Sequence, residues 1–246
     1  MQLSGAVVLV TGASGGIGAA VASVLAHRGA RPILTGRDGP RLRRLARDLG
    51  ARSLCADLLE PDGPRAVAEA VGPVDALIHC AGLGSVGRFA ALPAAEIDRL
   101  VATNLTAPML LTRELLPGML RHGRGHLTFV GSIAGLTGVP REATYSAAKA
   151  GLLTFADALR LELHGTGISV STLSPGAVDT PFWTHRGAPY DRVVPRMMSP
   201  EYVAEVLVRD IERSRARRVT PRWLALAPAV RAAAPRTYER LAGRFA

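Results

Sequence analysis

Short apolar runs alternate along this chain with longer segments of helical periodicity, and this alternation constrains the fold more than any other feature. Strands that are apolar throughout belong in a sheet covered on both faces, and a repeated strand-then-helix order is typical of a parallel sheet. The expected strands span residues 6–10, 32–35, 76–79, 126–130 and 168–173. The expected helices span residues 17–28, 40–49, 64–71, 94–120 and 143–164. The sequence therefore predicts an α/β fold, a doubly wound parallel sheet with helices on both faces.

The 246 residues contain no internal repeat, low-complexity linker or charge block that would mark a domain boundary. A chain of this length can form one large core, and its 48% hydrophobic and 20% charged residues exclude a disordered chain. We therefore expect a single domain over residues 1–246.

The formal net charge is +10, and all but one of the 30 basic residues are arginine. These arginines are spread along the chain, aromatic residues make up 4%, and no nucleic-acid motif occurs, so nucleic-acid binding is not expected. The same composition contains a single lysine, Lys149, and a single asparagine, Asn104. In a chain so poor in both residue types, the two that remain suggest a chemical need.

The cysteines, Cys55 and Cys80, are too few for a disulfide framework. The N-terminus has no basic region or cleavage site of a signal peptide, and no run approaches the roughly 18 apolar residues of a membrane span. We therefore expect a cytoplasmic protein.

A glycine-rich segment, TGASGGIG at residues 11–18, lies directly between the first expected strand and the first helix. Glycines there permit a tight turn and a close approach of a pyrophosphate to free N–H groups at the positive end of the helix. A purely structural turn is the alternative, but the position between strand and helix favours nucleotide binding. The candidate residues are Gly12, Ser14, Gly15, Gly16, Ile17 and Gly18.

The end of the second expected strand bears on the choice of nucleotide. An acidic residue about 20 positions after the glycines would accept the ribose 2′-hydroxyl of NAD, whereas Arg37 stands there and can bind a 2′-phosphate. The sequence therefore favours NADP(H), with NAD(H) possible. The alternative is a solvated surface arginine.

Tyr145 and Lys149 are spaced i and i+4, on one face of a helix. A free phenol has a pKa near ~10, and a neighbouring ammonium together with an oxidised nicotinamide would lower it toward a useful acid–base range. Ser132, thirteen positions before Tyr145, follows a strand and could hold a substrate carbonyl. An ordinary Tyr–Lys contact with Ser132 as a helix cap is the alternative.

Together these motifs resemble the short-chain dehydrogenase/reductase family, in the branch of β-ketoacyl carrier-protein reductases and ketone reductases. The resemblance covers roughly residues 5–182 and implies a single Rossmann domain, with residues 1–125 mainly for cofactor binding. Residues 126–200 would form the catalytic and substrate region, and residues 201–246 a basic C-terminal segment. Its further motifs are CADL with Asp57 and Leu58, CAG with Cys80, Ala81 and Gly82, and PG…VDT with Pro175, Gly176, Val178 and Thr180.

The resemblance also implies roles for individual residues. Ser132 would bind the carbonyl, Tyr145 would be the acid–base group, and Lys149 would bond the nicotinamide ribose. Asn104 would kink its helix and hold a water beside Lys149. The sole lysine and the sole asparagine thus fall on catalytic positions. Among the cofactor contacts, Asp57 would meet the adenine, Ala81 and Gly82 would line the cofactor, and Thr180 would approach the carboxamide.

At one position the sequence departs from the family, because His79 and Cys80 stand where two asparagines are common. One His–Cys pair lacks the ligands of a closed zinc site, so no metal is predicted and we interpret His79 as a packing residue at a strand end.

The segment after Pro175 contains aromatic residues and methionines that would form a lid over an apolar or aromatic substrate, or else core under a helix. Leu136, Val139 and Arg141 would form the opposite wall. In the C-terminal segment, arginines alternate with apolar residues around three prolines. This segment could dock an anionic membrane or an acidic carrier protein, but a cap on the domain or an oligomer contact is favoured.

The sequence therefore predicts an NADP(H)-dependent oxidoreductase that interconverts a ketone or aldehyde and an alcohol. The alternatives are a cofactor-binding regulatory protein and an isomerase or dehydratase on the same fold. The resemblance further implies a homodimer or homotetramer, built on the helices that hold Asn104 and Tyr145.

Overall fold

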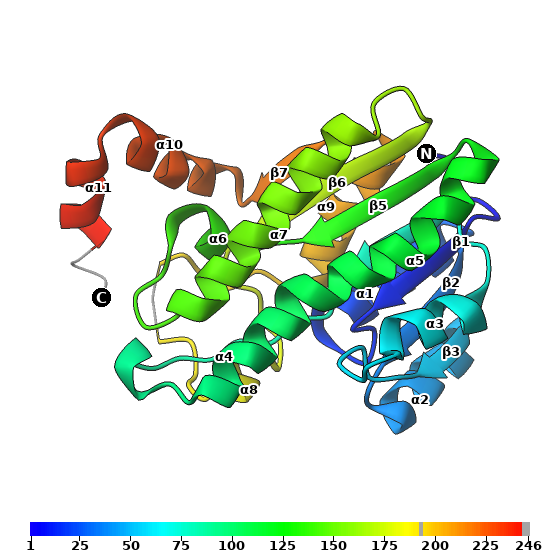
Figure 1. The fold of residues 1–246 in the computed structure, drawn as a ribbon, viewed down its shortest axis with the longest axis horizontal. Helices are drawn as coiled ribbons and strands as arrows, with labels where there is room; N and C mark the ends of the chain where they lie inside the picture. The colour runs from blue at the N-terminus through cyan, green and yellow to red at the C-terminus, as the bar shows by residue number, and fades with distance from the viewer. Residues whose placement is uncertain (192–193, 243–246) are drawn as a thin grey trace.

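The computed structural model describes residues 1–191 and 194–242. One seven-stranded sheet, with the strand order β3-β2-β1-β4-β5-β6-β7 and every neighbouring pair parallel, forms the centre of the molecule (Figure 1). Its strands are β1 Val7–Thr11, β2 Arg31–Gly36, β3 Arg52–Cys55, β4 Ala76–His79, β5 Gly125–Val130, β6 Ile168–Pro175 and β7 Arg217–Thr220. The predicted doubly wound parallel sheet is confirmed.

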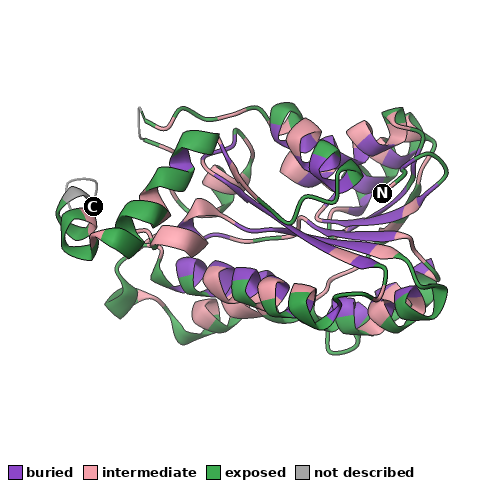
Figure 2. Ribbon diagram, turned by 90° about the horizontal axis from the view of Figure 1, so that it is seen from above, coloured by how far each residue is buried: buried purple, intermediate pink, exposed green. Residues whose placement is uncertain are grey.

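Helices cover both faces of this sheet (Figure 2). One face is packed by α1 Gly16–His27, α2 Gly39–Leu49 and α9 Pro200–Glu212, and the other by α3 Gly63–Val71, α5 Ala107–His122 and α7 Ala143–Glu162. Successive residues of β1 serve opposite faces, so Val8 and Val10 lie in the first core and Leu9 in the second. Burial of each such side chain stabilises the fold by about 1.5–3 kcal/mol.

The structure adds two strands to those expected, and both lie at the edges of the sheet. β3 has the sequence RSLC and β7 has RRVT, and neither is buried along its whole length. An edge strand is covered less completely than a central one, so it does not need the continuous apolar run by which the inner strands were predicted.

The single helix expected over 94–120 is interrupted. It consists of α4 Ala94–Val101, a π-helical turn η2 Ala102–Thr106, and α5. Asn104 lies inside the π-helical turn. The family resemblance implied a distortion of the helix at this residue, and a π-helical turn is such a distortion.

The remaining elements are short or lie late in the chain. They are η1 Phe89–Ala91, α6 Ile133–Thr137, α8 Phe182–His185, η3 Arg222–Ala225, α10 Leu226–Ala233 and α11 Pro235–Ala242. None of the helices that the structure describes is both long and apolar enough to span a bilayer.

His79 closes β4 as a packing residue, as predicted. Its Nε2 lies 2.9 Å from the Thr112 hydroxyl of α5, and its ring stacks on Phe129 with the centroids 4.9 Å apart. Burial lowers the pKa of His79 to about 3, so the imidazole is neutral at physiological pH. Within residues 1–191 and 194–242, no three His, Cys, Asp or Glu side chains are gathered as a metal site.

Candidate active site

A cleft of about 1360 Å³ opens at the carboxyl ends of the strands. β1 and β4 are neighbours there, and the chain turns outward from them in opposite directions, which is the usual ligand position in a doubly wound sheet. Every residue predicted to be catalytic or to bind cofactor, with the exception of Asn104, lines this cleft.

The glycine segment forms the floor of the cleft between β1 and α1. Gly12 has φ +67°, and a Cβ there would lie 2.7 Å from the Cα of Ala81. A Cβ on Gly18 would lie 2.4 Å from the Gly12 carbonyl oxygen, so both positions exclude any side chain. The first turn of α1 begins at Gly15 without a side-chain cap, which leaves its N–H groups for an anion. This cradle fits the pyrophosphate of a dinucleotide.

Basic side chains flank the end of β2. Arg37 lines the cleft with its Nη1 3.8 Å from the Asp57 carboxylate. Arg41, which the sequence analysis missed, also lines it from the first turn of α2. Asp38 caps α2 by accepting from the Arg41 N–H at 3.0 Å, and the same carboxylate lies 3.2 Å from the Arg41 Nε. The sequence could have indicated Arg41, because an aspartate three residues before it is typical of a helix N-cap. Such a cap places the first turn of α2, with Arg41, beside Arg37.

Ser132, Tyr145 and Lys149 meet on the other side of the cleft. Tyr145 and Lys149 lie one turn apart on α7, with the Lys149 Nζ 6.0 Å from the centroid of the phenol ring. Ser132 caps α6 by accepting from the Ala134 N–H at 3.1 Å, and its side chain lies near enough to Tyr145 to lower the pKa of the phenol. Ser132 therefore both caps α6 and lines the cleft beside Tyr145.

Burial determines the electrostatics of this group. It raises the pKa of Tyr145 above its usual value, and the Ser132 side chain acts in the opposite direction. It also lowers the pKa of Lys149 to about 8, and the Lys149 ammonium donates to the Val130 carbonyl at 2.9 Å. Within the polypeptide, desolvation of the phenolate dominates. The lowered phenol pKa expected from the sequence needs the oxidised nicotinamide as well as Lys149, and it stays a prediction.

Asn104 is fully buried behind the cleft. Its Nδ2 donates to the carbonyls of Leu83 and Leu100 at 2.8 and 2.9 Å, and its Oδ1 accepts from the Leu83 N–H at 3.3 Å. A Cβ on Gly82 would lie 3.1 Å from the Asn104 Oδ1 and 3.5 Å from the Lys149 Nζ. Asn104 therefore ties the loop after β4 to the π-helical turn, close to Lys149.

Aromatic side chains form the wall next to Tyr145. The Phe182 ring lies 5.6 Å from the phenol ring, centroid to centroid, and Trp183 packs between Phe182 and Tyr190. All three line the cleft, as the lid interpretation predicts, whereas Met198 packs against the core.

Of the three residues expected in the facing wall, Val139 and Arg141 line the cleft. Leu136 does not, and its carbonyl accepts from Arg231 of α10 at 2.9 Å.

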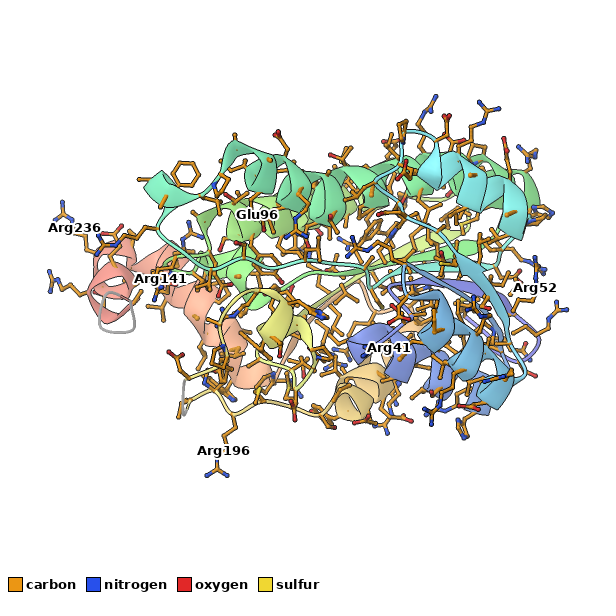
Figure 3. All side chains as sticks on the ribbon, turned by 90° about the horizontal axis from the view of Figure 1, so that it is seen from below. Arg41, Arg52, Glu96, Arg141, Arg196 and Arg236 are labelled. Atoms are coloured by element: carbon orange, nitrogen blue, oxygen red, sulfur yellow. The ribbon has the colours of Figure 1, made fainter. Side chains whose placement is uncertain are left out.

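The C-terminal segment contributes to the cleft more than the sequence analysis expected. η3, α10 and α11 extend beyond the end of β7, away from the sheet, and Arg236, the second residue of α11, projects outward (Figures 1 and 3). The apolar residues between the three prolines indicated that this segment packs against another surface. Nothing in the sequence indicated that the surface would be the cleft. The lining residues from this segment are Trp223, Leu224, Leu226, Ala227, Val230, Tyr238 and Ala242. The described part of the segment ends at residue 242.

Several arginines of the C-terminal segment that precede η3 are paired within the domain. Arg218 binds both oxygens of Asp210 at 2.7 and 2.6 Å, Arg215 lies 3.3 Å from the same carboxylate, and Arg217 pairs with Asp157 at 2.9 Å. These contacts hold the edge strand β7 against α9 and α7.

A nucleotide cradle facing a Ser–Tyr–Lys group places the chain among the dinucleotide-dependent oxidoreductases with an α/β fold. A family model described as short chain dehydrogenase matches residues 6–191, and the chain belongs to this family. The predicted family is thereby confirmed.

Characterised relatives share most of the chain. It is 35% identical over 219 residues to ketoacyl reductase HetN of a Nostoc species, covering 85% of this chain and 76% of that protein. It is 34% identical over 186 residues to the 3-oxoacyl-[acyl-carrier-protein] reductase FabG of Vibrio cholerae, covering 73% and 76%. Among solved structures, a short-chain dehydrogenase from Sphingobium yanoikuyae in complex with NADPH superposes with a TM-score of 0.83 at 32% identity, over 92% of this chain and 94% of that one.

Proposed function

We propose that this oxidoreductase reduces a ketone or aldehyde to an alcohol, and catalyses the reverse reaction, with NADP(H) as the preferred cofactor. The observation that carries the proposal is the grouping of Ser132, Tyr145 and Lys149 in the same cleft as the glycine cradle, with Lys149 one turn from Tyr145 on α7. Relatives named as ketoacyl reductases and structural neighbours solved with NADPH support it.

When bound, the nicotinamide would supply or accept the hydride. The Ser132 and Tyr145 hydroxyls would hold the substrate oxygen from one side, which fixes the carbonyl carbon in a reactive orientation. As the alkoxide develops, Tyr145 would donate its proton to that oxygen, and in the reverse direction it would take the proton from the alcohol. The buried Lys149 would place a positive charge near the phenolate, and Asn104 would keep the adjacent loop in position.

The raised pKa of Tyr145 favours the reductive direction. At neutral pH the phenol stays protonated, and this is the form that an acid catalyst needs. Oxidation requires the phenolate, so we expect it to need higher pH.

The cleft walls indicate an apolar substrate. Phe182 and Trp183 close one side next to Tyr145, and Trp223, Leu226 and Val230 of the C-terminal segment continue the apolar lining outward. An aromatic or acyl group attached to the carbonyl would bury apolar surface here.

A panel of ketones and aldehydes, read by NADPH absorbance with NADH in parallel, tests the proposal. Steady oxidation of NADPH with apolar ketones is expected. A protein that binds NADPH but oxidises none with any carbonyl would instead support a regulatory role, or an isomerase or dehydratase without net cofactor consumption.

Replacing Arg37 with serine is expected to change the cofactor preference. A charge-assisted hydrogen bond contributes about 1.5–3 kcal/mol, so kcat/KM with NADPH would fall by roughly 10- to 100-fold while the value with NADH changes little. Arg44→Ser is the matched control, since Arg44 is exposed on α2, the helix that follows Arg37, and does not line the cleft. Equal losses with both cofactors would contradict a 2′-phosphate contact.

The same proposal includes assembly into a dimer or tetramer through α5 and α7. These helices carry the exposed apolar residues Met109, Leu110, Leu120 and Leu161, which are candidates for an interface. Light scattering after gel filtration is expected to give at least twice the 25.8 kDa chain mass, and a monomer at micromolar concentration would contradict this assembly.

A further inference from the structure

Arg186 and Glu142 form an ion pair within the protein at the substrate side of the cleft. The Arg186 Nη1 donates to the Glu142 carboxylate, and the two side chains are only 8% and 10% exposed. Arg186 ends α8, and Glu142 is the N-cap residue of α7, three residues before Tyr145. The pair therefore joins the aromatic wall to the start of the catalytic helix.

All three nitrogens of the Arg186 guanidinium are engaged. Besides the bond to Glu142, its Nε donates to the Ala188 carbonyl at 3.1 Å and its Nη2 to the Pro189 carbonyl at 3.2 Å. The guanidinium carbon also lies 4.4 Å from the centroid of the Trp183 ring. The Arg186 side chain therefore holds both Trp183, which precedes it in the sequence, and Ala188 and Pro189, which follow it.

A third segment, the loop after β4, closes around the same pair. The Val86 N–H donates to the Arg186 carbonyl at 3.2 Å, and the Gly87 N–H donates to the carbonyl of Arg141, the residue before Glu142, at 2.9 Å. A Cβ on Gly84 would lie 2.4 Å from the Phe182 ring, so this loop packs directly against the aromatic wall.

We propose that Arg186 and Glu142 are positioning residues that clamp the Phe182–Trp183 wall to the N-terminal end of α7, and that this clamp sets the shape of the substrate cavity beside Tyr145. The proposal rests on the carbonyl reduction proposed above, because that reaction gives the cavity its substrate. Neither residue needs to touch the reacting atoms.

A gain in folding stability does not by itself explain why the chain has a buried ion pair here. Desolvating two charges costs about as much as their attraction returns, and buried pairs can often be replaced by apolar residues without loss. When every nitrogen of a guanidinium is hydrogen-bonded, however, the planar group can adopt few other orientations. The pair therefore fixes the orientation of the segments that it joins. Its position at the junction of three cleft-lining segments is where fixed orientation would affect specificity.

The kinetic test uses Arg186→Met, Glu142→Gln and the double variant. With a bulky apolar ketone, each single variant is expected to lower kcat/KM by roughly 10- to 100-fold, as small misplacements near reacting groups do. The double variant should lose no more than the worse single variant, because each change breaks the same clamp. A small ketone that does not reach Trp183 should show a much smaller change in KM.

Arg218→Met is the matched control. It breaks a comparably buried arginine–carboxylate pair, with Asp210, which lies outside the cleft. If loss of any buried pair impaired catalysis through general destabilisation, this control would mimic Arg186→Met, and the clamp would be refuted. Arg186→Lys keeps the charge but not the fork, so it should recover only part of the activity.

The pH profile of alcohol oxidation separates a clamp beside Tyr145 from a remote structural role. The charged and titratable side chains that line this part of the cleft are Arg141, Glu142, Lys149, His185, Arg186, Tyr190, Asp191 and Tyr238. Glu142 raises the pKa of Tyr145 and Arg186 lowers it. The pH at which the oxidation rate rises with formation of the phenolate should therefore be higher in Arg186→Met and lower in Glu142→Gln. If the pair had only a structural role remote from Tyr145, neither variant would shift this pH.

A fluorescence measurement tests the clamp without any activity. Trp183 and Trp223 are the two tryptophans, so Trp223→Phe leaves Trp183 as the only emitter. In that background, Glu142→Gln is expected to increase acrylamide quenching of Trp183, although Glu142 belongs to another element and acts on Trp183 only through Arg186. Unchanged quenching in Glu142→Gln would overturn the clamp even if the protein reduces ketones. A protein that reduces no carbonyl but shows increased quenching in Glu142→Gln would refute the proposed function and leave the clamp standing.

Discussion

Tyr145→Phe is expected to lower kcat for ketone reduction by roughly 10²- to 10⁴-fold, the usual contribution of a positioned acid or base. Phenylalanine keeps the ring that packs against Phe182 but removes the hydroxyl. The developing alkoxide would then have no acid beside it and would have to take its proton from solvent. Initial rates with NADPH and the best ketone of the panel measure the effect.

Two controls make the result specific to the phenol. NADPH affinity, read from cofactor fluorescence, should stay within about twofold of the wild-type value, because the ring and the cradle are intact. Tyr190→Phe removes a hydroxyl that donates to the Pro195 carbonyl at 2.6 Å in the same cleft, and it should lower kcat far less. Full turnover by Tyr145→Phe would eliminate the mechanism.

Lys149→Met is expected to reduce activity and increase stability at the same time. Loss of the ammonium should lower kcat/KM by at least about 10²-fold, as removal of a stabilising donor at a reactive centre does. Its buried charge costs the fold roughly 3 kcal/mol, since the pKa falls from 10.5 to about 8. Methionine removes that cost but loses the bond to the Val130 carbonyl, worth about 1 kcal/mol, so the free energy of unfolding at pH 7 should rise by about 2 kcal/mol.

The pH dependence of this effect has a defined sign. Below pH 8, Lys149 is protonated in both the folded and the unfolded chain, and the full cost of burial is present. Between pH 8 and 10.5 the unfolded chain binds the proton and the folded chain releases it, so the cost fades and wild-type stability gains relative to the variant. Urea unfolding at pH 7 and pH 10 measures the difference. A variant less stable than wild type at pH 7, or a gap that widens with pH, would contradict this account.

The central part of the fold was predictable because its signals are local. β1, β2, β4, β5 and β6 are buried on both faces, so each needs an apolar run that can be read from the sequence. β3 and β7 were not predicted because helices do not cover both faces of an edge strand completely, so these strands lack a continuous apolar run. The interruption at Asn104 has a comparable cause, since the bonds of its side chain to Leu83 and Leu100 exist only once the loop after β4 packs against the helix.

The site was predictable to a similar extent. The residues proposed to meet the cofactor or carry the chemistry lie in short motifs whose chemistry follows from residue type and spacing, such as the glycines of residues 11–18 or Tyr145 and Lys149. Arg41 and the C-terminal lining were not predictable, because each reaches the cleft from an element whose direction depends on tertiary packing. The rise of the Tyr145 pKa caused by burial was also beyond the sequence, since it depends on how much water the folded cleft excludes.

The amino-acid sequence by itself determined the doubly wound sheet, the glycine cradle and the side chains proposed to carry the chemistry. These rest on periodicity, on glycines at positions that exclude a Cβ, and on a lysine and an asparagine that occur once each. Only the tertiary structure decided which groups are desolvated, which aromatic residues stand beside Tyr145, and that Arg186 and Glu142 pair there across 44 residues of chain. Burial and long-range pairing depend on how segments pack together, and no local pattern in the sequence specifies that.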